Sequence, residues 1–121
     1  MITIALVGSC LSTFAETPAF RVVADADTPV PGKGGKFQGF GGFGGSETSF
    51  AFYGKFGGGE GIYIRDADGQ TQKALATGDI APDSRKKMLS FGIPSISYRQ
   101  VAFRGIRSDR RPAIYTGNAQ K

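Results

Sequence analysis

The sequence predicts an all-β fold of antiparallel four-stranded meander repeats, which form a partial, β-propeller-like structure of two incomplete blades. Turns are frequent, because 19 glycines and 6 prolines exceed the average combined share of about 12%. The stretches between them are short, apolar and aromatic, which is typical of β-strands, and no window has the spacing of a long amphipathic helix. An internal repeat with a period near 51 residues matches the size of one propeller blade.

The first segment, residues 1–19, is apolar and contains a candidate signal peptide. The uncharged stretch 2–14, ITIALVGSCLSTF, is too short to span a bilayer. Its length and composition are typical of the hydrophobic region of a secretory signal peptide, although no Lys or Arg precedes it. We therefore expect a secreted or cell-envelope protein without a transmembrane span. The alternative is a buried strand or short helix in a cytoplasmic fragment.

Residues 20–121 form the predicted repeat domain, with units over about 20–73 and 74–121. Five segments recur in the same order: VP at 30–31 and AP at 81–82, FG at 40–41 and 91–92, FAFYG at 50–54 and VAFRG at 101–105, GIY at 61–63 and AIY at 113–115, and VA at 23–24 and LA at 75–76. Six matched residues are expected to be structural: Phe52, Gly54, Tyr63, Phe103, Gly105 and Tyr115.

The strands of one unit are named a to d in chain order. A lone strand d at residues 20–24 precedes a loop at 25–36 that is rich in glycine and proline. The first unit then has its four strands at residues 41–46, 49–53, 61–65 and 72–76. After a second loop at 77–87, the second unit has strands a, b and c at residues 94–97, 101–104 and 112–116. The lone strand d is available to pair with the last strand c and complete the second blade.

Several repeated motifs resemble those of a known family. They are VADADTPVPG at 23–32, FGIPSIS at 91–97, VAFRG at 101–105 and the IY pairs at 62–63 and 114–115. They resemble the VADxxTxIPGG, FGxPSIS, VAFxG and GIY segments of a bacterial secreted tandem-repeat family, some members of which carry a PEP-CTERM anchor. The chain departs from this pattern in its second loop, at residues 42–46, where GFGGS replaces the first PSIS strand, and in lacking an anchor after Lys121. The resemblance implies a propeller-like fold without a defined activity.

Common catalytic designs lack their residues in this sequence. There is no histidine, and cysteine occurs once, which excludes a Ser-His-Asp triad, a His-ligated zinc site and an internal disulfide. We therefore expect no cofactor and no enzymatic activity. The predicted function is that of a non-catalytic extracellular structural or binding module whose ligand the sequence does not identify.

Four aspartates on the loops between units are the candidate ligand-binding residues: Asp25, Asp27, Asp79 and Asp83. If the units stack as blades, these loops lie on one face, where a glycan or a cell-surface partner would bind. Paired carboxylates about 5–9 Å apart also hydrolyse glycosides. The alternative function is therefore a carboxylate-based glycan hydrolase, while a purely structural interpretation assigns the aspartates to Asx turns.

Two further motifs favour structural interpretations. Asp66 and Asp68 form a weak candidate calcium site, but positions 64 and 75 lack the acids of an EF-hand loop, so we predict a turn and no bound metal. The segment GFGGFG at 39–44 fits a dinucleotide-binding pattern. Because no helix is expected after it, we predict a glycine-rich loop or strand.

The formal net charge of +5 is concentrated in the second half of the chain. Basic residues cluster at 85–87 and 104–111, but no recognition helix or RNA-binding motif accompanies them, which argues against a nucleic-acid partner. Two blades are fewer than the roughly 4–8 of a closed propeller. We therefore expect a homo-oligomer, or further repeats of a longer chain.

Overall fold

The computed structural model describes residues 19–47 and 49–118. Within these ranges the chain contains strands and no helix, which confirms the all-β prediction. The candidate signal peptide falls on residues 1–18 and lies outside the described residues. No helix long and apolar enough to cross a membrane occurs in the part of the chain that the structure describes.

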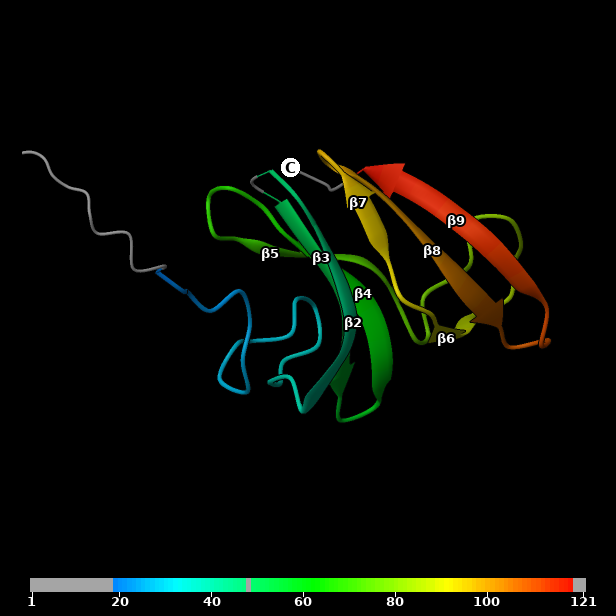
Figure 1. The fold of residues 1–121 in the computed structure, drawn as a ribbon. Helices are drawn as coiled ribbons and strands as arrows, with labels where there is room; N and C mark the ends of the chain where they lie inside the picture. The colour runs from blue at the N-terminus through cyan, green and yellow to red at the C-terminus, as the bar shows by residue number, and fades with distance from the viewer. Residues whose placement is uncertain (1–18, 48, 119–121) are drawn as a thin grey trace, which may run out of the picture.

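The first sheet is an antiparallel meander of four strands, as predicted (Figure 1). Its strands, in both chain order and sheet order, are β2 (Gly39–Ser46), β3 (Ser49–Phe56), β4 (Gly59–Arg65) and β5 (Thr71–Ala76). Two residues connect β3 to β4, and the loop between β4 and β5 is an Asx turn around Asp66. Short connections of this kind force neighbouring strands to pair.

The second sheet is built around one central strand. Its strands are β6 (Met88–Phe91), β7 (Ser95–Ser97), β8 (Gln100–Arg107) and β9 (Pro112–Asn118). β9 lies on one side of β8, while β6 and β7 pair with opposite ends of β8 on the other side. β6 and β7 are therefore two halves of one edge strand, interrupted at residues 92–94, where Pro94 cannot donate a backbone hydrogen bond.

The predicted lone strand at residues 20–24 is wrong. These residues form no strand, and they do not complete the second sheet. They lie instead against the first sheet, where the Arg65 guanidinium donates a hydrogen bond to the Val23 carbonyl oxygen and Val23 and Ala24 pack on buried aromatic rings. Among the described residues, no strand pairs with the outer edge of β9.

The two sheets have the same strand register, displaced by 51 residues. The pairs Gly44–Ala51, Gly45–Phe50 and Ser46–Ser49 correspond to Ser95–Ala102, Ile96–Val101 and Ser97–Gln100. On the other side of β3 and β8, the pair Phe52–Tyr63 corresponds to the pair Phe103–Tyr115. The displacement of the second residue in the pair is 52 rather than 51, because the second hairpin is one residue longer. A one-residue slip in either sheet would turn every apolar side chain to the wrong face.

The loops before the two sheets also share their hydrogen bonds. The Val30 amide donates to the Gly35 carbonyl at 2.7 Å, and the Ala81 amide donates to the Lys86 carbonyl at 2.8 Å. A bond from Thr28 to Asp25 corresponds to one from Asp79 to Ala76. Asp25 is therefore equivalent to Ala76, and residues 23–24 are equivalent to residues 74–75. The sequence repeat had matched residues 23–24 with residues 75–76 instead.

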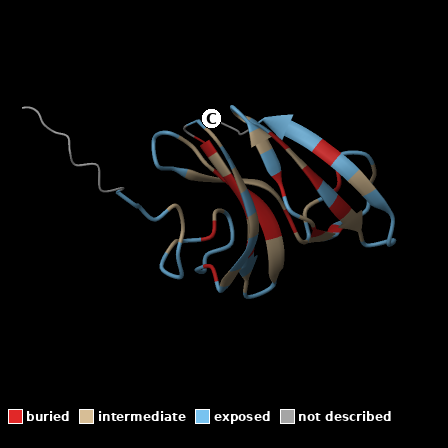
Figure 2. Ribbon diagram, viewed as in Figure 1, coloured by how far each residue is buried: buried red, intermediate tan, exposed pale blue. Residues whose placement is uncertain are grey.

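The main core lies between the two sheets (Figure 2). Ala51, Ile62 and Ile64 of the first sheet are at most 1% exposed, and they belong to one cluster with Val101, Phe103 and Tyr115 of the second sheet. Because side chains alternate along strands, Phe52 and Tyr63 point to the opposite face of the first sheet. There they form a second cluster with Val30 and Phe37 of the preceding loop.

Candidate functional site

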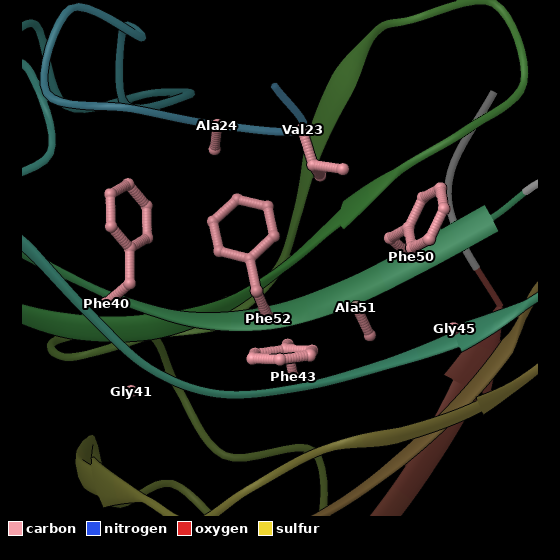
Figure 3. A pocket seen from close by; sticks show the side chains of 9 residues that line it. All are labelled: Val23, Ala24, Phe40, Gly41, Phe43, Gly45, Phe50, Ala51 and Phe52. Atoms are coloured by element: carbon pink, nitrogen blue, oxygen red, sulfur yellow. The ribbon is translucent and has the colours of Figure 1, made fainter. Parts of the chain in front are cut away.

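An open apolar hollow lies on the face of the first sheet that the second sheet does not cover. Its volume is about 420 Å³, and its lining includes Phe40, Phe50 and Phe52 from β2 and β3, with Val23 and Ala24 opposite. Figure 3 shows the rings of Phe40 and Phe52 pointing from their strands towards the segment that carries Val23 and Ala24. The sequence indicated the aromatic strands but not this hollow, because its formation depends on where residues 20–24 lie.

An aromatic cluster adjoins the hollow, which Phe40 and Phe52 line directly. The Phe37 ring centroid lies 4.9 Å from that of Tyr63 and 5.5 Å from that of Phe52, and the Phe40 and Phe52 centroids are 5.7 Å apart. All three pairs have the edge-on geometry that aromatic rings favour. At the rim, Phe43 is 78% exposed and Phe40 is 44% exposed. An exposed aromatic patch of this kind is typical of a protein-contact surface.

All six matched structural residues lie buried in the two sheets: Phe52, Gly54, Tyr63, Phe103, Gly105 and Tyr115. Glycine is required at position 54, because a Cβ there would lie 2.6 Å from the Phe37 ring. At the equivalent Gly105 the near atom is the Met88 methyl group at 2.5 Å, the end of a flexible side chain. Gly54 thus lets the Phe37 ring of the preceding loop pack on the first sheet, and Gly105 lets Met88 of β6 pack on β8.

The glycines of β2 allow the two sheets to approach each other. A Cβ at Gly42 would lie 2.4 Å from Ile93, and one at Gly44 would lie 3.4 Å from the Pro94 carbonyl oxygen. Nearby, the Tyr98 amide donates a 2.8 Å hydrogen bond to the Ser46 hydroxyl, which links the two sheets. The segment at 39–44 is therefore part of a strand that packs closely on the second sheet, and the described residues after it form no helix.

Asp25 and Asp27 lie on the first loop and form contacts with other residues of the same loop. One carboxylate oxygen of Asp25 accepts hydrogen bonds from the Asp27 amide and the Thr28 hydroxyl. Asp27 pairs with Lys36 at 3.7 Å, with 89% of the Asp27 side chain exposed. An ion pair this exposed contributes little to stability.

Asp79 and Asp83 have different partners on the second loop. Asp79 accepts a hydrogen bond from the Ala76 amide at 2.9 Å and pairs with Lys73 at 3.0 Å. Thr28 makes the equivalent backbone contact in the first loop, where its hydroxyl accepts from the Asp25 amide. No group of three or more acidic or cysteine side chains that would hold a metal occurs within residues 19–47 and 49–118.

Asp83 joins the second loop to β8 and β9. Its carboxylate accepts hydrogen bonds from the Tyr115 hydroxyl at 3.2 Å and from Arg107 at 3.3 Å. Arg107 also forms a bidentate pair with Asp109, and its hydrogen bond lowers the pKa of the Asp109 carboxyl. Burial and the bond to Asp83 raise the pKa of Tyr115.

Asp66 is a turn residue rather than part of a metal cluster. Its Oδ1 accepts hydrogen bonds from the amides of Asp68 and Gln70 at 3.0 and 3.2 Å, and its Oδ2 accepts from the Gln72 side chain. Asp68 itself is exposed. This is the Asx geometry that the D-x-D-G pattern favoured.

Sequence reasoning missed one polar link between the sheets. The Tyr53 hydroxyl donates a 2.5 Å hydrogen bond to Glu60, whose second carboxylate oxygen accepts from the Phe91 amide of the second sheet at 3.0 Å. Burial, together with the bond to Glu60, raises the pKa of Tyr53 to about 12. The available signal was the single acid in GGGEGIY, an otherwise uncharged stretch.

The two basic clusters of the sequence meet at one end of the second sheet. The Ser108 amide donates to the Lys87 carbonyl at 2.7 Å, which joins the loop to the turn between β8 and β9. Arg107, however, forms ion pairs with Asp83 and Asp109.

Comparisons of the chain with known protein families, with curated proteins and with solved structures find no match.

Proposed function

We propose that the protein is a non-catalytic, propeller-like repeat module that acts as a structural or binding element in the cell envelope or outside the cell. The observation that carries the proposal is the shared architecture of the two units. Strand register, loop hydrogen bonds and buried positions recur with a displacement of 51 residues, or of 52 in β9 after the longer hairpin. Modules of this kind act through the surfaces that stacked sheets present, and here that surface is the apolar hollow.

The candidate carboxylates support a structural role. Asp25 and Asp79 each accept hydrogen bonds within their own loop, and Asp83 is held by Tyr115 and Arg107. A glycosidase needs one carboxyl with a raised pKa facing a second across the substrate. Instead, two of these carboxylates form ion pairs with lysine side chains. The geometry therefore favours a module that binds without turnover over a hydrolase.

The experiment is a hydrolysis assay on a panel of polysaccharides with the purified chain, together with the Asp25→Asn, Asp27→Asn, Asp79→Asn and Asp83→Asn variants. We expect no release of reducing ends by any of these proteins. Turnover by the wild-type chain that one of the variants abolishes would refute the non-catalytic assignment.

Export is tested separately, by fractionating a bacterial host that expresses the chain and sequencing the N-terminus of the recovered protein. Intact protein that remains in the cytoplasm would refute the location.

A further inference from the structure

The stack of two sheets ends in two different surfaces that complement each other. At one end is the head face, the surface of the first sheet around Phe40, Phe50 and Phe52, which holds the hollow. At the other end is the tail face, the outer surface of the second sheet, which carries Ala102, Ile114 and Thr116. The contact between the two sheets inside the chain shows how a head face and a tail face would pack on each other.

Inside the chain, the second sheet presents to the first the same surface that the first sheet presents at the head face. Val101 and Phe103 of the second sheet are equivalent to Phe50 and Phe52. They are covered by Ala51, Ile62 and Ile64, which are almost fully buried. The head face therefore has the character of a surface that a neighbouring sheet covers, yet within the described residues no sheet lies over it.

The tail face carries the residues that would cover it. Its Ala102, Ile114 and Thr116 stand at the register positions of Ala51, Ile62 and Ile64. Ile114 is 73% exposed, whereas the equivalent Ile62 is fully buried. Two of the three positions thus keep the small and branched apolar side chains of the internal contact.

The strands missing at one end are present at the other. Within residues 19–47 and 49–118, the second sheet has strands a, b and c but no d. At the head face, Val23 and Ala24 pack on the first sheet as the equivalent Ala74 and Leu75 of β5 pack on the second. The hollow next to residues 23–24 is twice the volume of the cavity next to residues 74–75, 420 against 210 Å³. The open hollow therefore lies beside a segment that stands in the place of strand d.

We propose that copies of this chain associate head to tail. The second sheet of one copy fills the hollow of the next, and its β9 pairs with residues 20–24 of that next copy as the fourth strand. The pairing of β4 with β5 gives the register, because Ile62 lies opposite Leu75, so Ile114 lies opposite Ala24 across the contact. This proposal rests on the repeat architecture of the proposed function. It makes the partner at the hollow a second copy rather than a glycan.

The first test is analytical ultracentrifugation of the full chain over a range of concentrations. Phe43→Glu places a charge at the head rim, Ile114→Glu places one on the tail face, and Ile80→Glu on an exposed loop position is the matched control. We expect concentration-dependent association of the wild type and of the control. Each face variant should weaken association at least about tenfold, because an apolar contact cannot readily bury an unpaired charge.

Mixing the two face variants distinguishes the geometry of the contact. One variant retains an intact tail and the other an intact head, so the mixture should give a one-to-one dimer that cannot grow. Association that is lost in Phe43→Glu but unchanged in Ile114→Glu would mean that two head faces pair with each other, which overturns the proposal. A wild-type chain that stays monomeric at every concentration, including one whose own N-terminal segment fills the hollow, would also overturn it. Neither result bears on the hydrolysis assay.

The second test is a cross-link between the two paired strands. Ala24→Cys and Ile114→Cys are combined in a chain whose own cysteine is replaced by Cys10→Ser. Opposed residues of antiparallel strands have Cβ atoms about 4.5–5.5 Å apart, close enough for a disulfide after a small adjustment. Mild oxidation should give a ladder of covalent oligomers, whereas the control pair Ala24→Cys and Ile80→Cys should give none. Equal cross-linking of both pairs would contradict the register.

Discussion

At the scale of single residues, equivalent positions of the two units have different hydrogen-bond states. Tyr63 and Tyr115 occupy the same place in the register, and both are buried. The Tyr115 hydroxyl bonds to Asp83, while the buried Tyr63 hydroxyl has no hydrogen-bond partner among the described residues. A buried hydroxyl without a partner loses its contact with water and gains nothing in return.

Tyr63→Phe should therefore raise the free energy of unfolding by about 1 kcal/mol, since it removes a buried group that pays for desolvation. Tyr115→Phe should lower that free energy by about 0.5–1.5 kcal/mol, since it removes one hydrogen bond. Urea unfolding of the two variants beside the wild type measures both changes. Equal destabilisation by the two substitutions would contradict the difference between the two sites.

The link from Tyr53 to Glu60 predicts a loss of stability at alkaline pH. The pKa of Tyr53 rises from 10.0 to about 12 in the folded chain. Between these values the folded state keeps the proton and the unfolded state loses it, so the unfolding free energy falls as pH rises. Unfolding measured in steps from pH 8 to 12 should show a steeper decline for the wild type than for Tyr53→Phe. Parallel profiles would exclude this tyrosine as a cause.

At the scale of strands, the sequence predicted most of the fold. The alternation of apolar residues around Phe52 and Phe103, with glycines at both ends, placed β3, β4, β8 and β9 within a few residues of their observed bounds. The glycine-rich β2 was also expected. Strand β6 went unpredicted, because it is only four residues long and is separated from β7 by Pro94. Local patterns do not reveal that two short segments continue one edge strand.

The position of residues 20–24 also could not be predicted from the sequence. Their apolar pattern, FRVVA, fits a strand, but a strand requires a partner edge. Arg65 and the aromatic cluster hold Val23 and Ala24 on the first sheet, so this segment does not pair with β9 of the second sheet. Likewise, the sequence placed aspartates on both loops, but not the pairs with Lys73, Arg107 and Tyr115, which depend on tertiary contacts.

The central strand of the second sheet provides a prediction at this scale. Phe103 on β8 is 6% exposed and lies 5.9 Å, between ring centroids, from both Phe91 and Tyr115. Phe103→Ala should lower the free energy of unfolding by about 3–5 kcal/mol, since it leaves a cavity in the shared core. The exposed Phe43→Ala is the matched control and should change stability by less than about 0.5 kcal/mol. A loss below about 1 kcal/mol for Phe103→Ala would mean that the site collapses around the smaller side chain.

At the scale of the whole molecule, the two sheets depend on one core. Ala51, Ile62 and Ile64 are buried because the second sheet covers them, and Val101 and Phe103 are buried because the first sheet does. In repeat proteins, stability is approximately a sum of unit stabilities and the contacts between neighbouring units. Here the contact between units contains the larger of the two core clusters, so each sheet loses the cover of that cluster when the other unfolds. The first sheet keeps only the smaller cluster around Phe52 and Tyr63 on its other face.

The whole chain should therefore unfold in a single transition. Tyrosine fluorescence and far-UV circular dichroism should give coincident urea curves, with tyrosines in both sheets reporting. Ile62→Ala, which opens a cavity at the contact between the sheets, should shift both curves together by about 2–5 kcal/mol. The measurement is made at the lowest practical concentration, so that association between copies contributes least. If Ile62→Ala instead separated the curves into two steps, the sheets would be independent units, and the cluster around Phe52 and Tyr63 would be enough to hold the first sheet alone.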